Sequence, residues 1–277
     1  MITNFDELLL HLKERGKRKR VAVVCPTDES TLWALDRARR TGLADIICVD
    51  DDDKSVAAQR AVTLIRNGEA DVLMKGFVNT DVLLHAVLDK ETGLLEPGHV
   101  LTHITAACIP SYPKMLFFTD AAVIPYPTNA QRTEQVRYTV TLCRSLGIAV
   151  PRVSLIHCSE KVDAKHFPYT ADYSRLKAMA REGDFGRCIV DGPLDLKTSC
   201  DPHAMQVKGI QSAIKGQADI LVFPDIEAAN LFYKTITLFC DATTAGILQG
   251  TKVPVVLASR GDNPETKLYS IALACLS

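Results

Sequence analysis

The chain has 277 residues, and its 32 Lys and Arg residues against 33 Asp and Glu residues give a formal net charge of -1. Hydrophobic residues make up 47% of the chain, which is enough to fill a core and excludes an intrinsically disordered protein. The balanced charge excludes a general polyanion binder, because there is no excess of cations to release counterions, and we expect no nucleic-acid partner. The length suits two modest domains or one large one.

The N-terminal segment predicts an amphipathic helix. Asn4 is a suitable N-cap, with Glu7 three residues later in capping-box register. Phe5, Leu8 and Leu12 then fall on one helical face. Because acidic residues interrupt this stretch, we expect a helix and not a signal peptide. No apolar run approaches the roughly 18 residues that a membrane helix needs, so we expect no membrane partner.

The nine cysteines are widely spaced, odd in number and without a CxxC pair. This pattern predicts neither a zinc site nor a disulfide framework. Cysteines in apolar stretches behave as small hydrophobic residues, so we expect free thiols and a cytoplasmic location. His99 and His103 are four apart, as metal ligands on a helix are, but the surrounding pattern is strand-like and we expect no metal site.

Short β-rich segments alternate with helical patterns along the chain. Most candidate strands are near-continuous apolar runs, which is typical of parallel strands covered on both faces. We expect these strands at 20–25, 44–50, 70–75, 114–120, 152–158, 187–192, 218–224 and 253–259. Beyond the N-terminal helix, we expect helices near 28–41, 54–67, 79–90, 130–147, 170–182, 201–215, 226–240 and 263–276. The alternation indicates βαβ units and an α/β fold with mainly parallel sheets.

Two features indicate two lobes. Pro and aromatic residues cluster at 124–128, just before a long predicted helix, and the strand series starts afresh at residue 152. In α/β proteins, ligands bind at the C-terminal ends of the strands, often in a cleft between lobes. The places where predicted strands end are therefore the first candidates for functional residues.

The strand predicted at 70–75 ends in a possible anion-binding turn. Lys75 and Gly76 follow it, and Asn79 and Thr80 begin the next helix. Glycine permits close backbone approach, the helix N-terminus offers free N–H groups, and we expect Lys75 to add a mobile positive charge. The alternative is an ordinary strand–helix turn with Asn79 as N-cap, and spacing alone leaves both open.

A second strand–helix turn has the same features of a possible anion-binding site. The buried strand predicted at 253–259 ends at Ser259, Arg260 follows, and Pro264 suits the first turn of the next helix with Asp262 or Asn263 as its cap. A guanidinium group suits phosphate, because its planar donors bind two oxygens at once. The alternative is a capped turn with a solvated arginine.

The helix predicted at 226–240 carries a polar face. Asn230, Tyr233 and Lys234 are spaced at i, i+3 and i+4, so they share one side of the helix. An amide, a phenol and an ammonium group beside a cleft could hold a substrate. From spacing alone, a solvated helix face is the better interpretation.

Two other features do not support a function. Asp50 to Asp53 follow a predicted strand, but a dinucleotide-binding site needs GxGxxG after the first strand, and CPTDES stands there (25–30). A solvated loop is the better interpretation. The basic run at 13–20 is expected to be a solvated helix end, because basic side chains favour helix C-termini.

Several segments in order resemble the phosphate acetyltransferase and phosphate butyryltransferase family, and more closely its butyryl branch. They are MKGFVNTDVLLHAVLDKETGL (74–94), TDAAVIPYPT (119–128), LGIAVPRVSLI (146–156), DGPLDLK (191–197), KGIQSAIKGQADILVFPDIEAANLFYKT (208–235) and TKVPVVLASRGDNPETKLYSIALA (251–274). The family is similar in fold to the isocitrate dehydrogenase class. The resemblance therefore implies two α/β lobes, lobe I of residues 1–130 plus 244–277 and lobe II of residues 131–243.

The resemblance implies a reversible reaction in a ternary complex without an acyl-enzyme, in which butyryl-CoA and phosphate give butyryl phosphate and CoA. Ser259 and Arg260 match the family's catalytic Ser-Arg pair. The resemblance implies that Arg260 binds phosphate and stabilises the negative charge that develops in the reaction, while Ser259 donates a hydrogen bond to the thiolate or the carbonyl. The remaining matches imply substrate-binding roles for Lys75, Gly76, Asn79, Thr80, His85, Asn230, Tyr233, Lys234 and Asp262.

The chain departs from the family pattern at several positions. The acetyl branch has an acidic residue, thought to be a base toward CoA, where this chain has Thr266. Lys197 stands where an Asp is frequent, His85 where Arg or Lys is common, and Ala229 where the helix motif has Gly. These departures motivate an alternative, a catalytically degenerate member that binds CoA or acyl phosphate. A metal-dependent dehydrogenase on the same fold is disfavoured, because its cluster of Asp ligands is missing.

The resemblance also implies the partners of the chain. Acyl-CoA and phosphate would be substrates, and no cofactor would be bound permanently. The family usually forms dimers or assemblies of dimers, so we expect a homodimer or a higher homo-oligomer. Short-chain acyl phosphates imply a role in fermentation. Acyl chain length is not predictable, because one methylene changes selectivity by only about 1 to 3 kcal/mol.

Overall fold

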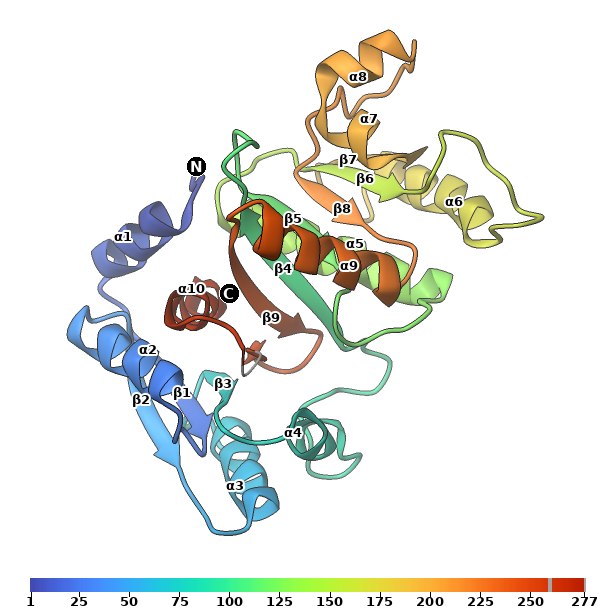
Figure 1. Cartoon of the computed structure of the whole chain (residues 1–277). Coiled ribbons are helices and arrows are strands. Elements are labelled where there is room, and N and C mark those ends of the chain that lie inside the picture. The colour runs from blue at the N-terminus through green and yellow to red at the C-terminus, as the bar shows by residue number, and fades with distance from the viewer. Residues whose placement is uncertain (259–260, 277) are drawn as a thin grey trace. The chain divides into compact units, whose positions relative to one another are not determined.

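The chain folds as an α/β protein, seen here in a computed structural model that describes residues 1–258 and 261–276 (Figure 1). It divides into two compact units. The terminal unit comprises residues 4–101 and 244–277, and the middle unit comprises residues 1–3 and 102–243. We expected a boundary near residue 130, but residues 102–130 fold with the middle of the chain, because Leu116–Thr119 pairs with Ile220–Val222.

The terminal unit is a mainly parallel sheet with helices. Its strands run in the order β2-β1-β3-β10-β9, and only the β10–β9 pair among its described strand pairs is antiparallel. The strands are β1 (Lys19–Val24), β2 (Ala44–Val49), β3 (Val72–Lys75), β9 (Thr243–Gln249) and β10 (Val255–Val256). The helices are α1 (Phe5–Arg15), α2 (Glu29–Arg40), α3 (Lys54–Arg66), α4 (Thr80–Leu88) and α10 (Pro264–Leu276).

Side-chain caps and apolar faces account for these helices. The Asn4 side chain accepts the Glu7 N–H at 2.9 Å, which confirms the predicted start of α1. Gly16, at φ 64°, ends that helix in the left-handed conformation that glycine adopts readily. The α1 helix packs on α10, where the Phe5 and Tyr269 rings stack with centroids 4.6 Å apart. Distant segments of the chain therefore share one core.

The middle unit repeats this plan in the strand order β4-β5-β8-β6-β7. The β4–β5 pair is antiparallel, and the pairs from β5 to β7 are parallel. The strands are β4 (Thr102–Cys108), β5 (Leu116–Thr119), β6 (Arg152–Ile156), β7 (Ile189–Leu194) and β8 (Ile220–Val222). The helices are α5 (Asn129–Ser145), α6 (Tyr169–Glu182), α7 (Leu196–Cys200), α8 (Pro202–Val207) and α9 (Ile226–Phe239).

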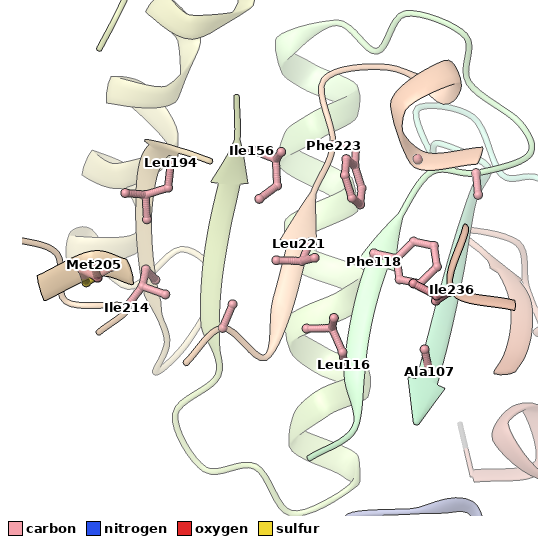
Figure 2. Packing of buried hydrophobic residues seen from close by; sticks show 13 residues of the cluster. Ala107, Leu116, Phe118, Ile156, Leu194, Met205, Ile214, Leu221, Phe223 and Ile236 are labelled. Atoms are coloured by element: carbon pink, nitrogen blue, oxygen red, sulfur yellow. The ribbon is translucent and has the colours of Figure 1, made fainter. Parts of the chain in front are cut away.

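The core of the middle unit lies between its sheet and α9. Figure 2 shows Phe118 of β5, Leu221 of β8 and Ile156 of β6 on the sheet, with Ile236 of α9 packed against Phe118. Phe118 makes edge-on contacts with Phe223 and Phe232, at centroid distances of 6.1 Å and 5.1 Å. A buried Phe truncated to Ala costs about 3 to 5 kcal/mol, so this cluster holds α9 on the sheet.

The predicted element pattern is confirmed in most places, with four differences. The strand β4 was not among the expected strands, although the pattern around His99 and His103 was interpreted as strand-like. The strand β9 was not predicted, because TTAGILQ mixes polar residues and a glycine with only a short apolar stretch. The short helix α7 was also missed, since its five residues are too few to show a repeating helical pattern of apolar residues. The helix expected at 201–215 ends at Val207, where Gly209 takes φ 65°. No helix in the described part of the chain is long and apolar enough to cross a membrane.

Candidate active site

The loops after β1, β2 and β3 gather at the carboxyl edge of the terminal sheet, because these three strands are parallel. A cavity of about 560 Å³ opens there. In α/β proteins this edge is the usual place for a ligand. The cavity is lined by Cys25, Thr27, Asp50, Asp51, Asp52 and Lys54.

Gly76 lies where two backbones come into direct contact. Its N–H donates to the Val24 carbonyl at 2.9 Å, and the Phe77 N–H donates to the Cys25 carbonyl at 2.7 Å. A Cβ atom on Gly76 would stand 2.3 Å from the Val24 oxygen. The loop therefore crosses the end of β1 so closely that only glycine fits. The predicted close approach at Gly76 is real, and its neighbour here is the protein's own backbone.

Lys75 is buried, with 5% of its surface exposed. Its Nζ donates to the carbonyls of Gly76 at 3.4 Å and Val78 at 3.3 Å. We expected a mobile positive charge, and that part of the prediction was wrong. Burying an ammonium group requires hydrogen-bond partners, and the loop's own carbonyls provide them. The cation thereby fixes the turn that leads into α4.

The other residues predicted beside this turn lie on the surface of α4. Asn79 is the N-cap by backbone conformation, and Thr80 is the first helical residue. Both are exposed, as is His85 in the last turn of the helix. The backbone at the start of α4 and the Lys75 loop are thus adjacent, whereas His85 lies more than one helical turn further along.

The proposed catalytic pair, Ser259 and Arg260, lies outside the described residues. The described chain resumes at Gly261, and the Asn263 side chain accepts the Thr266 N–H at 2.7 Å. Asn263 and not Asp262 therefore caps α10, which settles the two alternatives that the sequence left open. Thr266 is half-buried within the first turn of the helix.

A buried lysine holds this first turn of α10, and we did not predict it. Lys267 is 3% exposed, and its Nζ donates to Asp28 at 2.8 Å, Ser30 at 2.5 Å and Thr31 at 3.0 Å. Asp28 is also the N-cap of α2, accepting the Thr31 N–H at 2.9 Å. Burial raises the pKa of Asp28, but the Lys267 bond and the cap bonds outweigh it and lower this pKa well below its usual range. The sequence offered one signal for this contact, which is a lysine on the apolar face of the helix predicted at 263–276.

A buried carboxylate organises the carboxyl end of β5 in the middle unit. Asp120 is 3% exposed and accepts the Thr102 hydroxyl at 2.8 Å and the His103 N–H at 3.0 Å. It also accepts the N–H groups of the two residues after Ala121. The Asn230 amide then donates to the Ala121 carbonyl at 3.0 Å. This loop therefore has a fixed shape, and one predicted residue, Asn230 of α9, is bonded to it.

The three polar residues predicted on α9 lie on one face, as their spacing required. Tyr233 is half-buried against the core, and the Lys234 ammonium lies 5.1 Å from its ring centroid. Ala229 is fully buried at the position where the family motif has Gly. An alanine side chain therefore fits the packing of the helix at this position. Asn230 and Lys234 are exposed on the same helix.

A charged network closes the ends of β6 and β7. Lys208 pairs with Glu160 at 2.9 Å and with Asp195 at 2.5 Å. Burial alone would raise the pKa of Asp195, but the Lys208 bond lowers it. Asp195 also caps α7, through the Thr198 N–H at 2.6 Å. Lys197, the departure from the family pattern, is exposed in α7, and Glu160 and Asp195 provide the carboxylates of the network.

The described residues form neither a metal site nor a disulfide. All nine cysteines are free thiols. Within residues 1–258 and 261–276, no group of three or more His, Cys, Asp and Glu side chains could hold a metal ion. The geometry instead offers ammonium, amide and backbone N–H groups, which are suited to binding anions and carbonyl oxygens.

The fold and these side chains define an α/β protein whose polar and charged groups, of both signs, lie at the carboxyl ends of its parallel strands. The family model for Phosphate acetyl/butaryl transferase matches residues 51–275. The chain belongs to this family. It is 37% identical to the phosphate butyryltransferase of Clostridium acetobutylicum, over 100% of this chain and 98% of the relative. It is 34% identical to the phosphate acetyltransferase of Thermotoga maritima, over 95% of this chain and 96% of the relative.

Solved structures show the same fold. A branched-chain phosphotransacylase from Enterococcus faecalis is similar with a TM-score of 0.81 and 29% identity, over 93% of this chain and 98% of the other. A 4-hydroxythreonine-4-phosphate dehydrogenase from Salmonella typhimurium has a TM-score of 0.51 at 12% identity, over 94% of this chain and 99% of the other. The second likeness concerns the fold alone, and it agrees with the dehydrogenase-like architecture that we expected.

Proposed function

We propose that the chain is a phosphate acyltransferase that interconverts butyryl-CoA plus phosphate with butyryl phosphate plus CoA. One observation carries the proposal. The chain aligns over its whole length with relatives named phosphate butyryltransferase, at 37% and 38% identity. The transfer would be direct, within a ternary complex and without an acyl-enzyme.

The acyl transfer requires three contributions from the protein. Phosphate must be fixed in place, since positioning alone can contribute several kcal/mol. The thioester carbonyl develops negative charge, which cations and fixed N–H donors stabilise. The leaving thiolate needs a hydrogen bond or a proton. In our proposal Arg260 binds phosphate and the developing charge, and Ser259 donates to the thiolate or the carbonyl.

The terminal unit supports the phosphate part of this proposal. The Lys75 loop has a fixed backbone, because Gly76 and Phe77 bond to the end of β1. It leads directly into the N-terminus of α4, where free N–H groups favour an anion. Lys75 would act mainly by holding this loop in shape, since its ammonium is bonded to loop carbonyls.

The α9 face supports the acyl-CoA part. Lys234 offers a solvent-facing ammonium for a phosphate of CoA, and the Asn230 amide on α9 donates to the rigid loop after β5. Tyr233 would provide an apolar surface with a polar tip. With Asp262, Thr80 and His85 these residues form the proposed substrate-binding set. No permanently bound cofactor is part of the proposal.

The decisive experiment measures release of free thiol from acyl-CoA by the purified chain. We expect release from butyryl-CoA only when phosphate is present, and a rate series from C2 to C6 will give the chain-length preference. Arg260→Ala should lower kcat/KM by about 100-fold, the usual loss for a group that stabilises transition-state charge. Arg18→Ala, which removes an exposed ion pair with Asp45, is the matched control. No thiol release with any acyl-CoA in the series would exclude the proposal.

The departures from the family pattern at His85, Lys197 and Thr266 support one alternative function. In this alternative the chain is a degenerate family member that binds CoA or acyl phosphate without turnover. Calorimetry distinguishes the two. Heat of CoA binding combined with no thiol release supports the binder, whereas phosphate-dependent release supports the enzyme. The alternative also predicts that Arg260→Ala leaves every measured rate at the background level.

We further propose a cytoplasmic homo-oligomer, a dimer or a higher assembly, with a role in fermentation. The nine free cysteines support a reducing compartment. Exposed apolar side chains on α9 support association, namely Leu231 (69% exposed), Leu238 (70%) and Phe239 (77%). Light scattering after size-exclusion chromatography tests this, and Leu238→Glu should shift the mass to that of a monomer.

A further inference from the structure

The loop after β5 is built around the carboxylate of Asp120. Its Oδ1 accepts the N–H groups of Ala122 and Val123, each at 2.9 Å. Its Oδ2 accepts the Thr102 hydroxyl at 2.8 Å and the His103 N–H at 3.0 Å, both from the start of β4. A buried carboxylate requires such donors, and four of them hold this loop against the neighbouring strand.

The same loop is joined to the start of α9. The N–H groups of Phe223 and Ile226 donate to carbonyls at the two ends of the loop, at 3.1 Å and 3.0 Å. Between these two bonds, the Asn230 amide donates to the Ala121 carbonyl at 3.0 Å. Ala121 directly follows Asp120 in the chain. The carboxylate that fixes the loop therefore also fixes the carbonyl that Asn230 contacts.

The bond to Ala121 determines which end of the Asn230 amide is available to a ligand. A carbonyl oxygen only accepts hydrogen bonds, so the amide nitrogen faces it and the amide oxygen is directed elsewhere. No residue in the described part of the chain donates to this oxygen, and Asn230 is exposed on α9. Asn230 therefore presents a hydrogen-bond acceptor of fixed orientation to molecules in solution.

An acceptor of this kind suits one of the two proposed substrates better than the other. An amide oxygen pairs with a neutral hydrogen-bond donor. Acyl-CoA has such donors in the amide N–H groups of its pantetheine arm, whereas phosphate near neutral pH presents mainly acceptor oxygens. An acceptor that is already oriented also lowers the entropy cost of binding. The geometry of Asn230 thus favours a contact with acyl-CoA.

We propose that Asp120 is a positioning residue for acyl-CoA, which acts through the Ala121 carbonyl to orient the Asn230 amide toward a donor of the substrate. Asp120 is 3% exposed, so the substrate does not reach the carboxylate itself. The inference rests on the proposed acyl transfer, and it gives a role in substrate recognition to a residue that does not touch the substrate.

The thiol-release assay tests the role of Asn230, because KM is measured separately for butyryl-CoA and for phosphate. Asn230→Ala should raise the KM for butyryl-CoA by about 5-fold, the effect of one lost hydrogen bond, and leave the KM for phosphate unchanged. Asn230→Asp should raise it at least as much, because a carboxylate is repelled by the Ala121 carbonyl although it keeps an acceptor oxygen. An unchanged KM in Asn230→Asp would overturn the proposal, since the loop would then not orient the side chain.

A double-variant cycle tests whether Asp120 acts through Asn230. Asp120→Asn should also raise the KM for butyryl-CoA by about 5-fold, because its new NH2 group would face two donors and displace the loop. In the Asn230→Ala background it should raise this KM no further, since the side chain that the loop orients is already absent. A merely structural carboxylate would lower the free energy of unfolding in both backgrounds and leave KM unchanged. Additive increases in KM, or no increase in Asp120→Asn, would refute the positioning role.

A milder variant carries the test if circular dichroism shows that Asp120→Asn is unfolded. Thr102→Val removes one of the four bonds to Asp120 at nearly constant shape and should raise the KM for butyryl-CoA by about 2-fold. Thr105→Val is the matched control and should leave KM unchanged. Thr105 is a buried threonine of the same strand, and its hydroxyl contacts His103 Nδ1 at 3.3 Å instead of Asp120.

Calorimetry of CoA binding separates a failure of this inference from a failure of the proposed function. The same order of variants in Kd for CoA, without thiol release, would support the positioning role and exclude the enzyme. Thiol release with the same KM for butyryl-CoA in all variants would overturn the positioning role alone. Neither CoA binding nor thiol release would exclude both.

Discussion

The Asp28–Lys267 pair leads to the strongest stability prediction. Asp28→Asn keeps a good helix cap, since Asn and Asp cap about equally well, but it removes the charge that balances a lysine of 3% exposure. Removing one partner of a buried ion pair costs about 3 to 5 kcal/mol. The Asp28 side chain is 24% exposed, so water offers partial compensation. We therefore expect a loss of about 3 kcal/mol in the free energy of unfolding, at the lower end of that range.

The assay uses the chain's single tryptophan, Trp33, which lies in α2, the helix that Asp28 caps. Its fluorescence in urea reports the unfolding of the terminal unit. Lys267→Met should cost less, about 1 to 2 kcal/mol, because it removes the buried charge itself. The double variant should lose about 1 kcal/mol less than the sum of the single changes, because the two residues are in contact.

A matched control lies in the same helix. Asp36 and Arg40 form an exposed pair at 2.9 Å, with side chains 55% and 75% exposed. Asp36→Asn should therefore cost under about 0.5 kcal/mol. If Asp28→Asn costs no more than this control, or if the double variant is strictly additive, the Asp28–Lys267 ion pair does not stabilise the terminal unit.

The pH dependence follows from the sign of the shift. The pKa of Asp28 is lower in the folded chain than its unfolded value of about 3.9, so its contribution is present above that value. The contribution is lost as the pH decreases through the folded pKa. The difference in stability between the native chain and Asp28→Asn should accordingly shrink below about pH 4. A difference that stays constant down to acid unfolding would contradict this account.

Three further predictions concern the terminal unit. Gly76→Ala should lower its stability by about 2 kcal/mol, because the new Cβ would stand 2.3 Å from the Val24 carbonyl; urea unfolding measures this. Lys75→Met should lower kcat/KM for phosphate by about 10-fold in the thiol assay, since the loop loses its internal cation. Arg18→Met, which removes an exposed ion pair with Asp45, is the control. The Arg20 bond lowers the pKa of Asp71 to about 2; Asp71→Asn should therefore cost about 1 kcal/mol at pH 7, a difference that disappears as the pH approaches 2 in acid titrations.

Periodicity was enough to predict most of the fold. Apolar runs such as VAVV in β1 and the capping residue Asn4 are local signals, and local signals determine these elements. The strand β9 escaped prediction because its pairing with β10, and not its own composition, makes it a strand. The unit boundary escaped prediction for a similar reason, since the β5–β8 pairing joins segments about a hundred residues apart.

The candidate site was less predictable. The order of strands and loops predicted that Lys75 stands at the carboxyl end of a strand, and in the structure it is the last residue of β3. It could not predict that Lys75 turns back onto its own loop, because side-chain direction depends on tertiary partners. The Lys267–Asp28 contact joins residues 239 apart in the chain, and no pattern within either segment specifies the other.

The discontinuous terminal unit has a consequence for synthesis. Residues 102–243 of the middle unit are contiguous, so they are complete while the last part of the chain is still being made. The sheet of the terminal unit lacks β9 and β10 until residues 244–277 emerge, and until then α2 has no α10 to cover it. During that interval the open edge of β3 and the uncovered face of α2 are surfaces on which nascent chains could aggregate or chaperones could bind.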